Sequence, residues 1–402
     1  MNLKISKDAL NAIRIGGLCS LSYLAVYIAR NVLGAVSPKM IECGVFKTEQ
    51  IGILSSVFFT TYALGQLING FIGDRIKAKY MISLGLSLAG VAFIFFASVK
   101  ATPLFSYATY GMTGFFLSMI YGPMTKVVAE NTNPIHATRC SLGYTFSSLF
   151  GTPLAGVLAA VFLWHSTFIA SSSVMIFMGV ICFIFFSIYE KKKIIQYGKF
   201  KKPPKSEGNF KILIKRDIIR FSFIAVLTGI IRTSVVFWMP TYISQHLKFP
   251  TDKAALAFTV ATSVISVTPF ITIFVYERLK RNMYLTIRLG FILSTLSFLG
   301  VFLVENPTLN IICFVAAVMC CNSADSMMWS RYCPSLLDTG MVSTATGFLD
   351  FLSYMAAATA SSIFANAVSS VGWSNLILIW MGLMALGVLV LIPNNFIKKN
   401  DA

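Results

Sequence analysis

Two arginines, Arg30 and Arg232, lie in the middle of strongly apolar stretches, at matching positions in the two halves of the 402-residue chain. A proline follows each arginine after eight residues, at Pro38 and Pro240. A guanidinium group inside a membrane costs about 3 to 17 kcal/mol, depending on how the cost is measured. It stays protonated, and its planar fork of donors matches a phosphate or a carboxylate. We therefore predict a central site in which both arginines bind an anion.

Further polar residues accompany these arginines. Tyr23 and Tyr27 precede Arg30 by seven and three residues, so all three side chains share one face of a helix. Phenol hydroxyls beside a buried cation could orient a bound anion. Lys126 lies deep enough in its own apolar stretch to face a cavity, although its long side chain could instead extend to the membrane surface. The sequence predicts substrate contacts for Arg30, Arg232, Lys126, Tyr23 and Tyr27.

Two acidic residues, Asp325 and Asp350, also fall inside apolar stretches. In one interpretation, one of them carries a proton that is bound and released together with the substrate. In the other, both are static counter-charges. Set against Arg30, Arg232 and Lys126, they leave the site with a charge of about +1, which suits a monoanion or a zwitterion with a net negative charge. The sequence leaves both interpretations open.

The apolar stretches define the elements that must position these residues. Hydrophobic residues make up 56% of the chain and charged residues 12%, which is about half the charged share of an average soluble protein. Each stretch is long enough to cross the hydrocarbon core as a helix. We predict an all-α polytopic membrane protein with twelve transmembrane helices, at residues 13–36, 50–72, 80–99, 103–129, 139–162, 166–189, 217–247, 253–276, 283–304, 308–333, 342–368 and 374–393.

A long polar segment divides the chain. Residues 1–190 are predicted to form an N-terminal six-helix bundle, 191–216 a basic cytoplasmic linker, and 217–402 a C-terminal six-helix bundle. Most lysines and arginines lie in this linker, at the termini and in loops on the same side of the membrane. The opposite loops hold only Lys39, Lys47, Lys100, Lys248 and Lys253. The positive-inside rule places both termini in the cytoplasm, so the net charge of +18 indicates topology and attraction to membrane lipid, not nucleic acid.

The two halves repeat each other. Gly-Asp-Arg-Ile-Lys-Ala-Lys at 73–79 matches Tyr-Glu-Arg-Leu-Lys-Arg-Asn at 276–282, and Gly143-Tyr144 matches Gly347-Phe348 at nearly the same offset. Parallel six-helix repeats are related by an axis along the membrane normal and place a substrate site at their interface, near the midplane. We therefore predict two pseudo-symmetric bundles with the arginines at that interface.

The segment Gly-Phe-Ile-Gly-Asp-Arg-Ile-Lys-Ala-Lys at 70–79 resembles the cytoplasmic signature of the major facilitator superfamily. The stretch Tyr27-Ile-Ala-Arg30-Asn31 and the stretch that joins Arg232 to Trp238-Met-Pro240-Thr-Tyr242 resemble the organophosphate:phosphate antiporter family more closely. So does Ala-Thr-Gly-Phe at 345–348 with the following Tyr354. The resemblance covers nearly the whole chain and implies the twelve-helix fold of the superfamily.

This resemblance also implies residue roles. It gives Arg30 and Arg232 the task of clamping the substrate phosphate. It implies a cytoplasmic gating motif that holds neighbouring helix ends together through charge and helix-dipole contacts. The residues of this motif are Asp74, Arg75, Lys79, Glu277 and Arg278.

The chain departs from the family at several positions: Gln66 stands in place of a lysine, Phe146 in place of a histidine and Lys126 in place of an arginine, and Asp325 and Asp350 add acids inside the spans. The resemblance predicts a secondary active transporter that exchanges an organic phosphate for inorganic phosphate by alternating access. The departures at Gln66 and Phe146 favour a second possibility, proton-coupled symport of a carboxylate or an amino-acid-like anion. A third is a transporter-like sugar-phosphate receptor, against which the intact Asp74-Arg75 motif argues.

The sequence contains no hydrolase or kinase signature, no phosphate-binding Gly-Lys-Ser loop and no metal-ligand spacing. We therefore expect no enzymatic activity, no cofactor and no bound metal. The expected partners are a small anionic substrate, membrane lipid, and inorganic phosphate or a proton as coupling ion. The architecture predicts a monomer in the cell inner (plasma) membrane.

Overall fold

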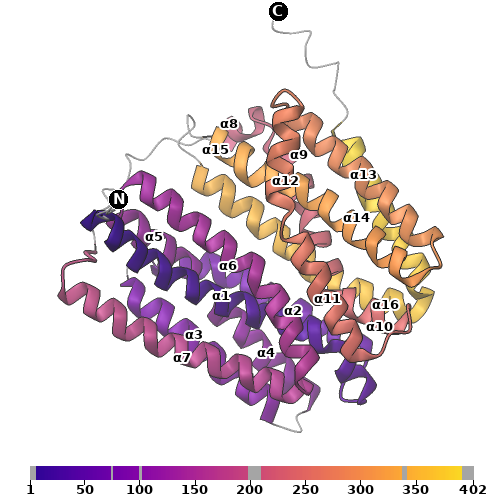
Figure 1. Ribbon diagram of the computed structural model, residues 1–402, viewed down its shortest axis with the longest axis horizontal. Coiled ribbons are helices and arrows are strands. Elements are labelled where there is room, and N and C mark those ends of the chain that lie inside the picture. Colours follow the sequence, from indigo (N-terminus) through magenta and orange to yellow (C-terminus); the bar gives the residue numbers. More distant parts are fainter. Residues whose placement is uncertain (1–5, 74–75, 99–101, 198–209, 337–341, 392–402) are drawn as a thin grey trace, which may run out of the picture. The chain divides into compact units, whose positions relative to one another are not determined.

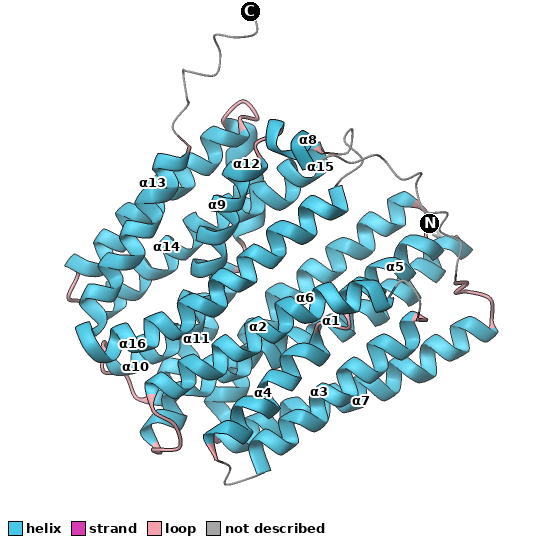
Figure 2. Cartoon of the chain, turned by 180° about the vertical axis from the view of Figure 1, so that it is seen from behind, coloured by secondary structure: helices cyan, strands magenta, loops and turns pink. Residues whose placement is uncertain are grey.

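The computed structural model describes residues 6–73, 76–98, 102–197, 210–336 and 342–391. Throughout these ranges helices dominate, joined by short loops (Figures 1 and 2). The helices are α1 (Lys7–Glu42), α2 (Thr48–Gly73), α3 (Ala78–Ser98), α4 (Pro103–Leu117), α5 (Tyr121–Asn131), α6 (Pro134–Val161), α7 (Trp164–Lys191), α8 (Phe210–Lys215), α9 (Ile218–Gly229), η1 (Ile230–Val235), α10 (Val236–Gln245), α11 (Thr251–Ile265), α12 (Thr268–Arg278), α13 (Met283–Leu303), α14 (Pro307–Met327), η2 (Met328–Tyr332), α15 (Cys333–Ser335) and α16 (Val342–Val390).

The twelve predicted spans all coincide with helical segments, and most of their ends agree within a few residues. Nine helical stretches in the described part of the chain are long and apolar enough to cross a membrane. Large apolar side chains such as Phe177, Val260 and Leu293 are at least half exposed on the helix surfaces. In lipid this exposure is favourable, because hydrocarbon surrounds the helices and their backbone groups are bonded internally. The predicted all-α, twelve-helix fold is confirmed.

Two of the predicted spans contain a short break in the helix. The 103–129 span consists of α4 and α5, and the 253–276 span consists of α11 and α12. Pro123 and Pro269 lie in the first turn after each break. Proline has no backbone N–H and its ring clashes with the carbonyl four residues earlier, so an α-helix cannot run through these points undisturbed.

Two other spans contain π-helical segments. The first, η1, follows α9 and carries Arg232, and the second, η2, follows α14 and begins three residues after Asp325. A π-helical turn has i→i+5 hydrogen bonds and often occurs at functional sites. The last two predicted spans follow α16 up to its end at Val390, and within this helix Gly372 has a φ of +79° and joins two helical legs. Glycine adopts this left-handed conformation without steric cost.

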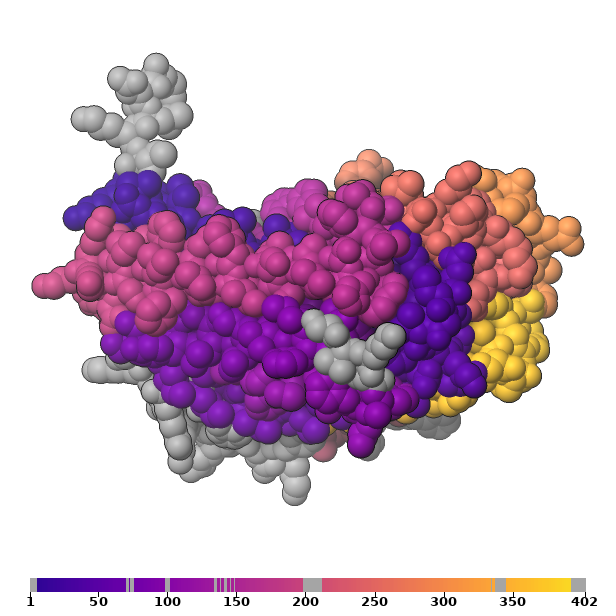
Figure 3. Space-filling model, turned by 90° about the horizontal axis from the view of Figure 1, so that it is seen from below, coloured from indigo at the N-terminus to yellow at the C-terminus, as the bar shows by residue number. Residues whose placement is uncertain are grey.

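The chain forms two compact units. Unit 1 contains residues 1–204, 234–266 and 357–369, and unit 2 contains 205–233, 267–356 and 370–402. This grouping follows packing, whereas the predicted halves at 1–190 and 217–402 follow the sequence repeat and stay a prediction. In unit 1, α1 packs against α6 and α7, and α3 packs along α7. Figure 3 shows α7, in pink, lying directly against the purple helices of this unit. In unit 2, α14 packs against α13, α12 and α9.

Polar contacts join distant helices within unit 1. The hydroxyl groups of Ser37 on α1 and Thr241 on α10 lie 2.7 Å apart. Ser55 on α2 donates to Ser361 on α16 over 3.1 Å, and Ser234 of η1 lies 3.1 Å from the same Ser361 hydroxyl. We call Ser55, Ser234 and Ser361 the hydroxyl cluster. Because it ties three sequence-distant segments together, it fixes their packing more specifically than apolar contact does.

Candidate functional site

Arg30 lies on α1 with only 8% of its surface exposed. Its guanidinium carbon lies 5.4 Å from the centre of the Tyr27 ring, 5.4 Å from Phe59 and 5.7 Å from Tyr62, both of which are on α2. Aromatic faces attract a cation, more strongly where water is excluded. Unlike a carboxylate, these rings carry no formal charge, so the positive charge of Arg30 is not cancelled by them.

The predicted tyrosines lie together on α1. The rings of Tyr23 and Tyr27 are 5.0 Å apart, and Tyr23 also contacts Tyr121 at 5.4 Å. The close approach of α6 shapes this region, because a Cβ atom on Gly151 would lie 2.4 Å from Tyr27 Cβ. The structure therefore brings Arg30, Tyr23 and Tyr27 into one cluster, as the helical spacing predicted. Their predicted contact with a substrate stays a prediction.

Arg232 and Asp325 form an ion pair in unit 2. Arg232 Nη1 lies 3.5 Å from Asp325 Oδ2, and the two side chains are 27% and 10% exposed. The other carboxylate oxygen, Oδ1, accepts a hydrogen bond from Trp329 Nε1 at 3.0 Å and from Thr228 Oγ1 at 3.3 Å. Thr228 comes from the last turn of α9 and Trp329 from η2, so both π-helical segments adjoin this pair.

A tight helix crossing positions the aromatic neighbour of Arg232. Gly229 lies so close to α16 that a Cβ atom there would be 2.4 Å from Ser353 Oγ and 2.5 Å from its carbonyl oxygen. The next residue, Tyr354, places its ring 6.0 Å from the Arg232 guanidinium carbon. Asp350 lies on the same helix, half-buried and four residues before Tyr354, so it shares that helix face.

The remaining predicted cation, Lys126, lies half-buried on α5, five residues after Tyr121. Arg30 and Lys126 belong to unit 1, and Arg232, Asp325 and Asp350 to unit 2. The expectation that they share one anion site therefore rests on the sequence symmetry and stays a prediction.

The predicted gating motif is partly described. Lys79 Nζ donates to Glu190 Oε2 over 2.5 Å, and Lys77 donates to the other oxygen of the same carboxylate. Its hydrogen bond with Glu190 raises the pKa of Lys77. Glu277 and Arg278 are exposed, and Arg278 lies over the Phe274 ring at 4.9 Å. Asp74 and Arg75 lie outside the described residues.

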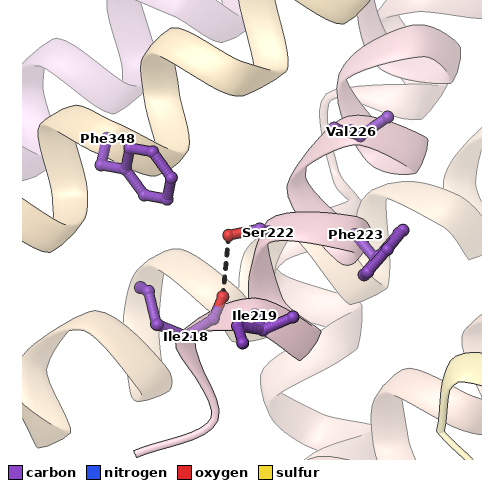
Figure 4. Close-up of a pocket in the computed structure, with 6 residues that line it drawn as sticks. All are labelled: Ile218, Ile219, Ser222, Phe223, Val226 and Phe348. Atoms are coloured by element: carbon purple, nitrogen blue, oxygen red, sulfur yellow. Dashed lines mark hydrogen bonds between the residues drawn. The ribbon is translucent and has the colours of Figure 1, made fainter. Parts of the chain in front are cut away.

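An apolar pocket in unit 2 does not suit an anion. It is lined by Ile218, Ile219, Ser222, Phe223, Val226 and Phe348 (Figure 4). The one hydroxyl in this lining, that of Ser222, donates to the carbonyl oxygen of Ile218 at 2.8 Å. No charged side chain lines the pocket, so it is better suited to an aliphatic group such as a lipid chain than to a phosphate.

Sequence reasoning missed the residues that surround the arginines from other helices. Phe59 and Tyr62 contact Arg30, and Trp329 bonds the carboxylate beside Arg232. Only the aromatic character of the 58–62 stretch and the spacing of four residues between Asp325 and Trp329 could have pointed to them.

Helices that span a membrane, together with guanidinium groups held inside the helical units, define a polytopic membrane protein of the transporter type. Residues 19–361 match the sequence profile of the Major Facilitator Superfamily. The chain belongs to this family of membrane transporters.

Solved structures agree with this fold. A bacterial homologue of the human lysosomal transporter Spinster matches with a TM-score of 0.78 at 12% identity, and the match covers 96% of this chain and 97% of the homologue. The D-xylose-proton symporter matches with a TM-score of 0.74 at 11% identity, and the match covers 94% of this chain and 97% of the symporter.

Curated relatives confirm the resemblance to the organophosphate transporters. The phosphoglycerate transporter protein of Salmonella typhimurium is 22% identical over 394 residues, which is 90% of this chain and 84% of that protein. The membrane sensor protein UhpC of Escherichia coli is 22% identical over 56% of each chain. The UhpC protein of Salmonella typhimurium is 30% identical over 97 residues, which is 22% of its length. The chain therefore spans about half or less of the length of these sensor-protein relatives.

Proposed function

We propose that the protein carries a small organic anion across the cell inner membrane by alternating access, and that it exchanges an organic phosphate for inorganic phosphate. The observation that carries this proposal is Arg30, a guanidinium group buried to 8% exposure in the middle of a transmembrane helix, among aromatic rings. Such a buried cation is costly, and an anionic substrate would offset the cost. In this proposal Arg30 and Arg232 bind the phosphate group, and Tyr23, Tyr27 and Lys126 line its path.

The names of the relatives support the phosphate class. They include a phosphoglycerate transporter protein and, in Bacillus subtilis, a glycerol-3-phosphate transporter that is 22% identical over 59% of each chain. A phosphate ester offers several oxygens to a guanidinium fork, which makes bidentate contacts.

The test is exchange of labelled inorganic phosphate into proteoliposomes preloaded with phosphate or left empty, with and without an inward proton gradient. We expect exchange that requires internal phosphate, ignores the gradient and is lost in Arg30→Ala. Arg14→Ala is the matched control, because Arg14 lies exposed on the same helix. Wild-type protein that exchanges no phosphate would reject this function.

A second candidate is proton-coupled symport of a carboxylate or amino-acid-like anion. The ion pair between Arg232 and Asp325 favours it, because a carboxylate beside the substrate arginine could take up a proton when the substrate binds. Uptake driven by the proton gradient into empty vesicles would establish this candidate in place of exchange.

A third candidate is a transporter-like receptor, which the name of the UhpC relatives suggests. A receptor would bind the anion without net flux. Protection of the protein from heat by phosphate, together with no exchange in the same preparation, would distinguish this candidate from both transport mechanisms.

A further inference from the structure

We propose that Asp325 is a fixed counter-charge that makes the substrate site prefer a singly charged anion over a doubly charged one. This inference rests on the proposed function, in which Arg232 binds the substrate anion. Asp325 acts through Arg232, so its role is to position that arginine and to set the selectivity of the site.

The position of the Asp325 carboxylate is set by neutral donors. Its Oδ1 atom accepts from Trp329 Nε1 at 3.0 Å and from Thr228 Oγ1 at 3.3 Å. Trp329 lies one helical turn after Asp325, and Thr228 lies one turn before Arg232 on the neighbouring helix. Two helices therefore hold this carboxylate in place, independently of the guanidinium group.

The contact between Arg232 and Asp325 is longer than a typical charge-assisted hydrogen bond. Arg232 Nη1 and Asp325 Oδ2 are 3.5 Å apart, whereas a charge-assisted hydrogen bond between such groups is about 2.7 to 2.9 Å long. An arriving anion can therefore draw the guanidinium group toward itself without removing Asp325 from its two donors. The Coulomb interaction persists over several ångströms in a low-dielectric environment, so Asp325 keeps acting on the site.

The Arg232 side chain is partly exposed, although its Nε and Nη2 atoms are buried. Its side chain is 27% exposed, and its guanidinium carbon lies 6.0 Å from the Tyr354 ring. Asp325, with a side-chain exposure of 10%, is the more deeply buried partner. In this proposal the anion approaches from the Arg232 side of the pair, and the carboxylate is the deeper group.

These features give the site a repulsive element as well as an attractive one. The charges of Arg232 and Asp325 sum to zero, so that with Arg30 the proposed site has a net charge of about +1. One negative charge on a ligand is then balanced, and a second is repelled by the fixed carboxylate. Selectivity often depends on such a built-in penalty against the wrong ligand. A phosphate diester, dihydrogen phosphate or a phosphate monoester that carries one proton fits this charge pattern, and a dianion does not.

The experiment compares two competitors of fixed charge against exchange of labelled inorganic phosphate in proteoliposomes. Dimethyl phosphate carries one negative charge, and sulfate carries two, throughout the working pH range. We expect dimethyl phosphate to compete better than sulfate in the wild-type protein. Asp325→Asn keeps an oxygen for Trp329 and Thr228 but removes the charge, so sulfate should gain at least about tenfold relative to dimethyl phosphate.

Two controls isolate the charge of Asp325. Asp325→Glu keeps the negative charge and should retain the wild-type preference. Asp217→Asn makes the same charge change at the first residue before α9, about 20 Å along the helix from Arg232, and should also retain it. Exchange that persists in Asp325→Asn with an unchanged ratio of the two competitors would overturn the inference. If neither wild type nor Asp325→Asn exchanges phosphate or responds to either competitor, the proposed function itself is wrong.

Discussion

At the scale of single residues, the two arginines are held by different chemistry. Arg30 lies among aromatic rings, which attract the cation without cancelling its formal charge, whereas Arg232 lies beside a carboxylate that does cancel it. In the proposed site, Asp325 would therefore weaken the attraction of Arg232 for an anion, and Arg232 would contribute chiefly direction and geometry. The two arginines match in sequence position, but aromatic rings contact Arg30 and a carboxylate contacts Arg232.

The first prediction concerns the crossing beside Arg232. Gly229→Ala would place a methyl group 2.4 Å from Ser353 Oγ and 2.5 Å from a backbone oxygen, so α9 and α16 must move apart. Overpacking of this kind costs about 1 to 3 kcal/mol, and we expect a lower thermal unfolding midpoint in detergent together with weaker phosphate exchange.

Gly347→Ala is the matched control for this substitution. Gly347 lies on α16, and a Cβ atom there would meet nothing within 4 Å. A helical glycine replaced by alanine in open space is neutral or gains about 0.5 to 1 kcal/mol. Equal unfolding midpoints for the two variants would contradict the close approach at Gly229.

How far the site could be predicted from sequence depends on the range of each contact. The cluster of Tyr23, Tyr27 and Arg30 follows from the 3.6-residue period of one helix, so the spacing alone predicts it. The contacts of Arg30 with Phe59 and Tyr62 join two helices, and no local rule gives their mutual rotation. The same holds for Thr228 and Asp325, which are on neighbouring helices.

At the scale of secondary-structure elements, hydropathy located the spans well because a helix must bury about 20 apolar residues to cross the hydrocarbon core. The breaks before Pro123 and Pro269 have a local cause and could have been predicted from the prolines. The π-helical segments η1 and η2 could not, because the i→i+5 pattern has no reliable signal in the residue types.

The second prediction tests whether the contact between α2 and α16 must open during transport. Ser55 and Ser361 have their hydroxyl oxygens 3.1 Å apart, so cysteines at both positions can approach the geometry of a disulfide. We expect the Ser55→Cys, Ser361→Cys double variant to form a disulfide on oxidation, to lose phosphate exchange, and to regain it on reduction.

Each single cysteine variant serves as a control, since the chain already has eight free cysteines. Oxidation of either single variant should leave exchange at the untreated level. A cross-linked double variant that still exchanges phosphate would show that this contact stays closed throughout the cycle.

At the scale of the whole molecule, the distribution of lysine and arginine predicts a single orientation in the membrane, with both termini in the cytoplasm. The third prediction uses Cys43, which lies in the loop between α1 and α2 and is exposed, whereas the other seven cysteines are buried or half-buried. A membrane-impermeant maleimide should label it in intact cells, because α1 separates it from the N-terminus by one crossing.

Cys43→Ser should abolish this labelling and leave transport unchanged. Labelling that appears only after the membrane is permeabilised would place the N-terminus outside and reverse the proposed topology.

The overall fold is the level at which the sequence was most informative, because twelve apolar stretches and an internal repeat leave few alternative architectures. The packing of helices within each compact unit was not predicted, because it depends on tertiary contacts such as the hydroxyl cluster of unit 1.

The segment η1 has a mechanical consequence for Arg232. A π-helical turn contains one residue more than an α-helical turn, and each residue of an α-helix turns its side chain by about 100°. If the extra residue of the π-helical turn moves past Arg232 along the helix, the arginine side chain rotates by about this angle. Only the backbone hydrogen bonds of the moving turn change, between the i→i+5 and the i→i+4 pattern. The guanidinium group can thus rotate about the axis of its own helix without unwinding of that helix.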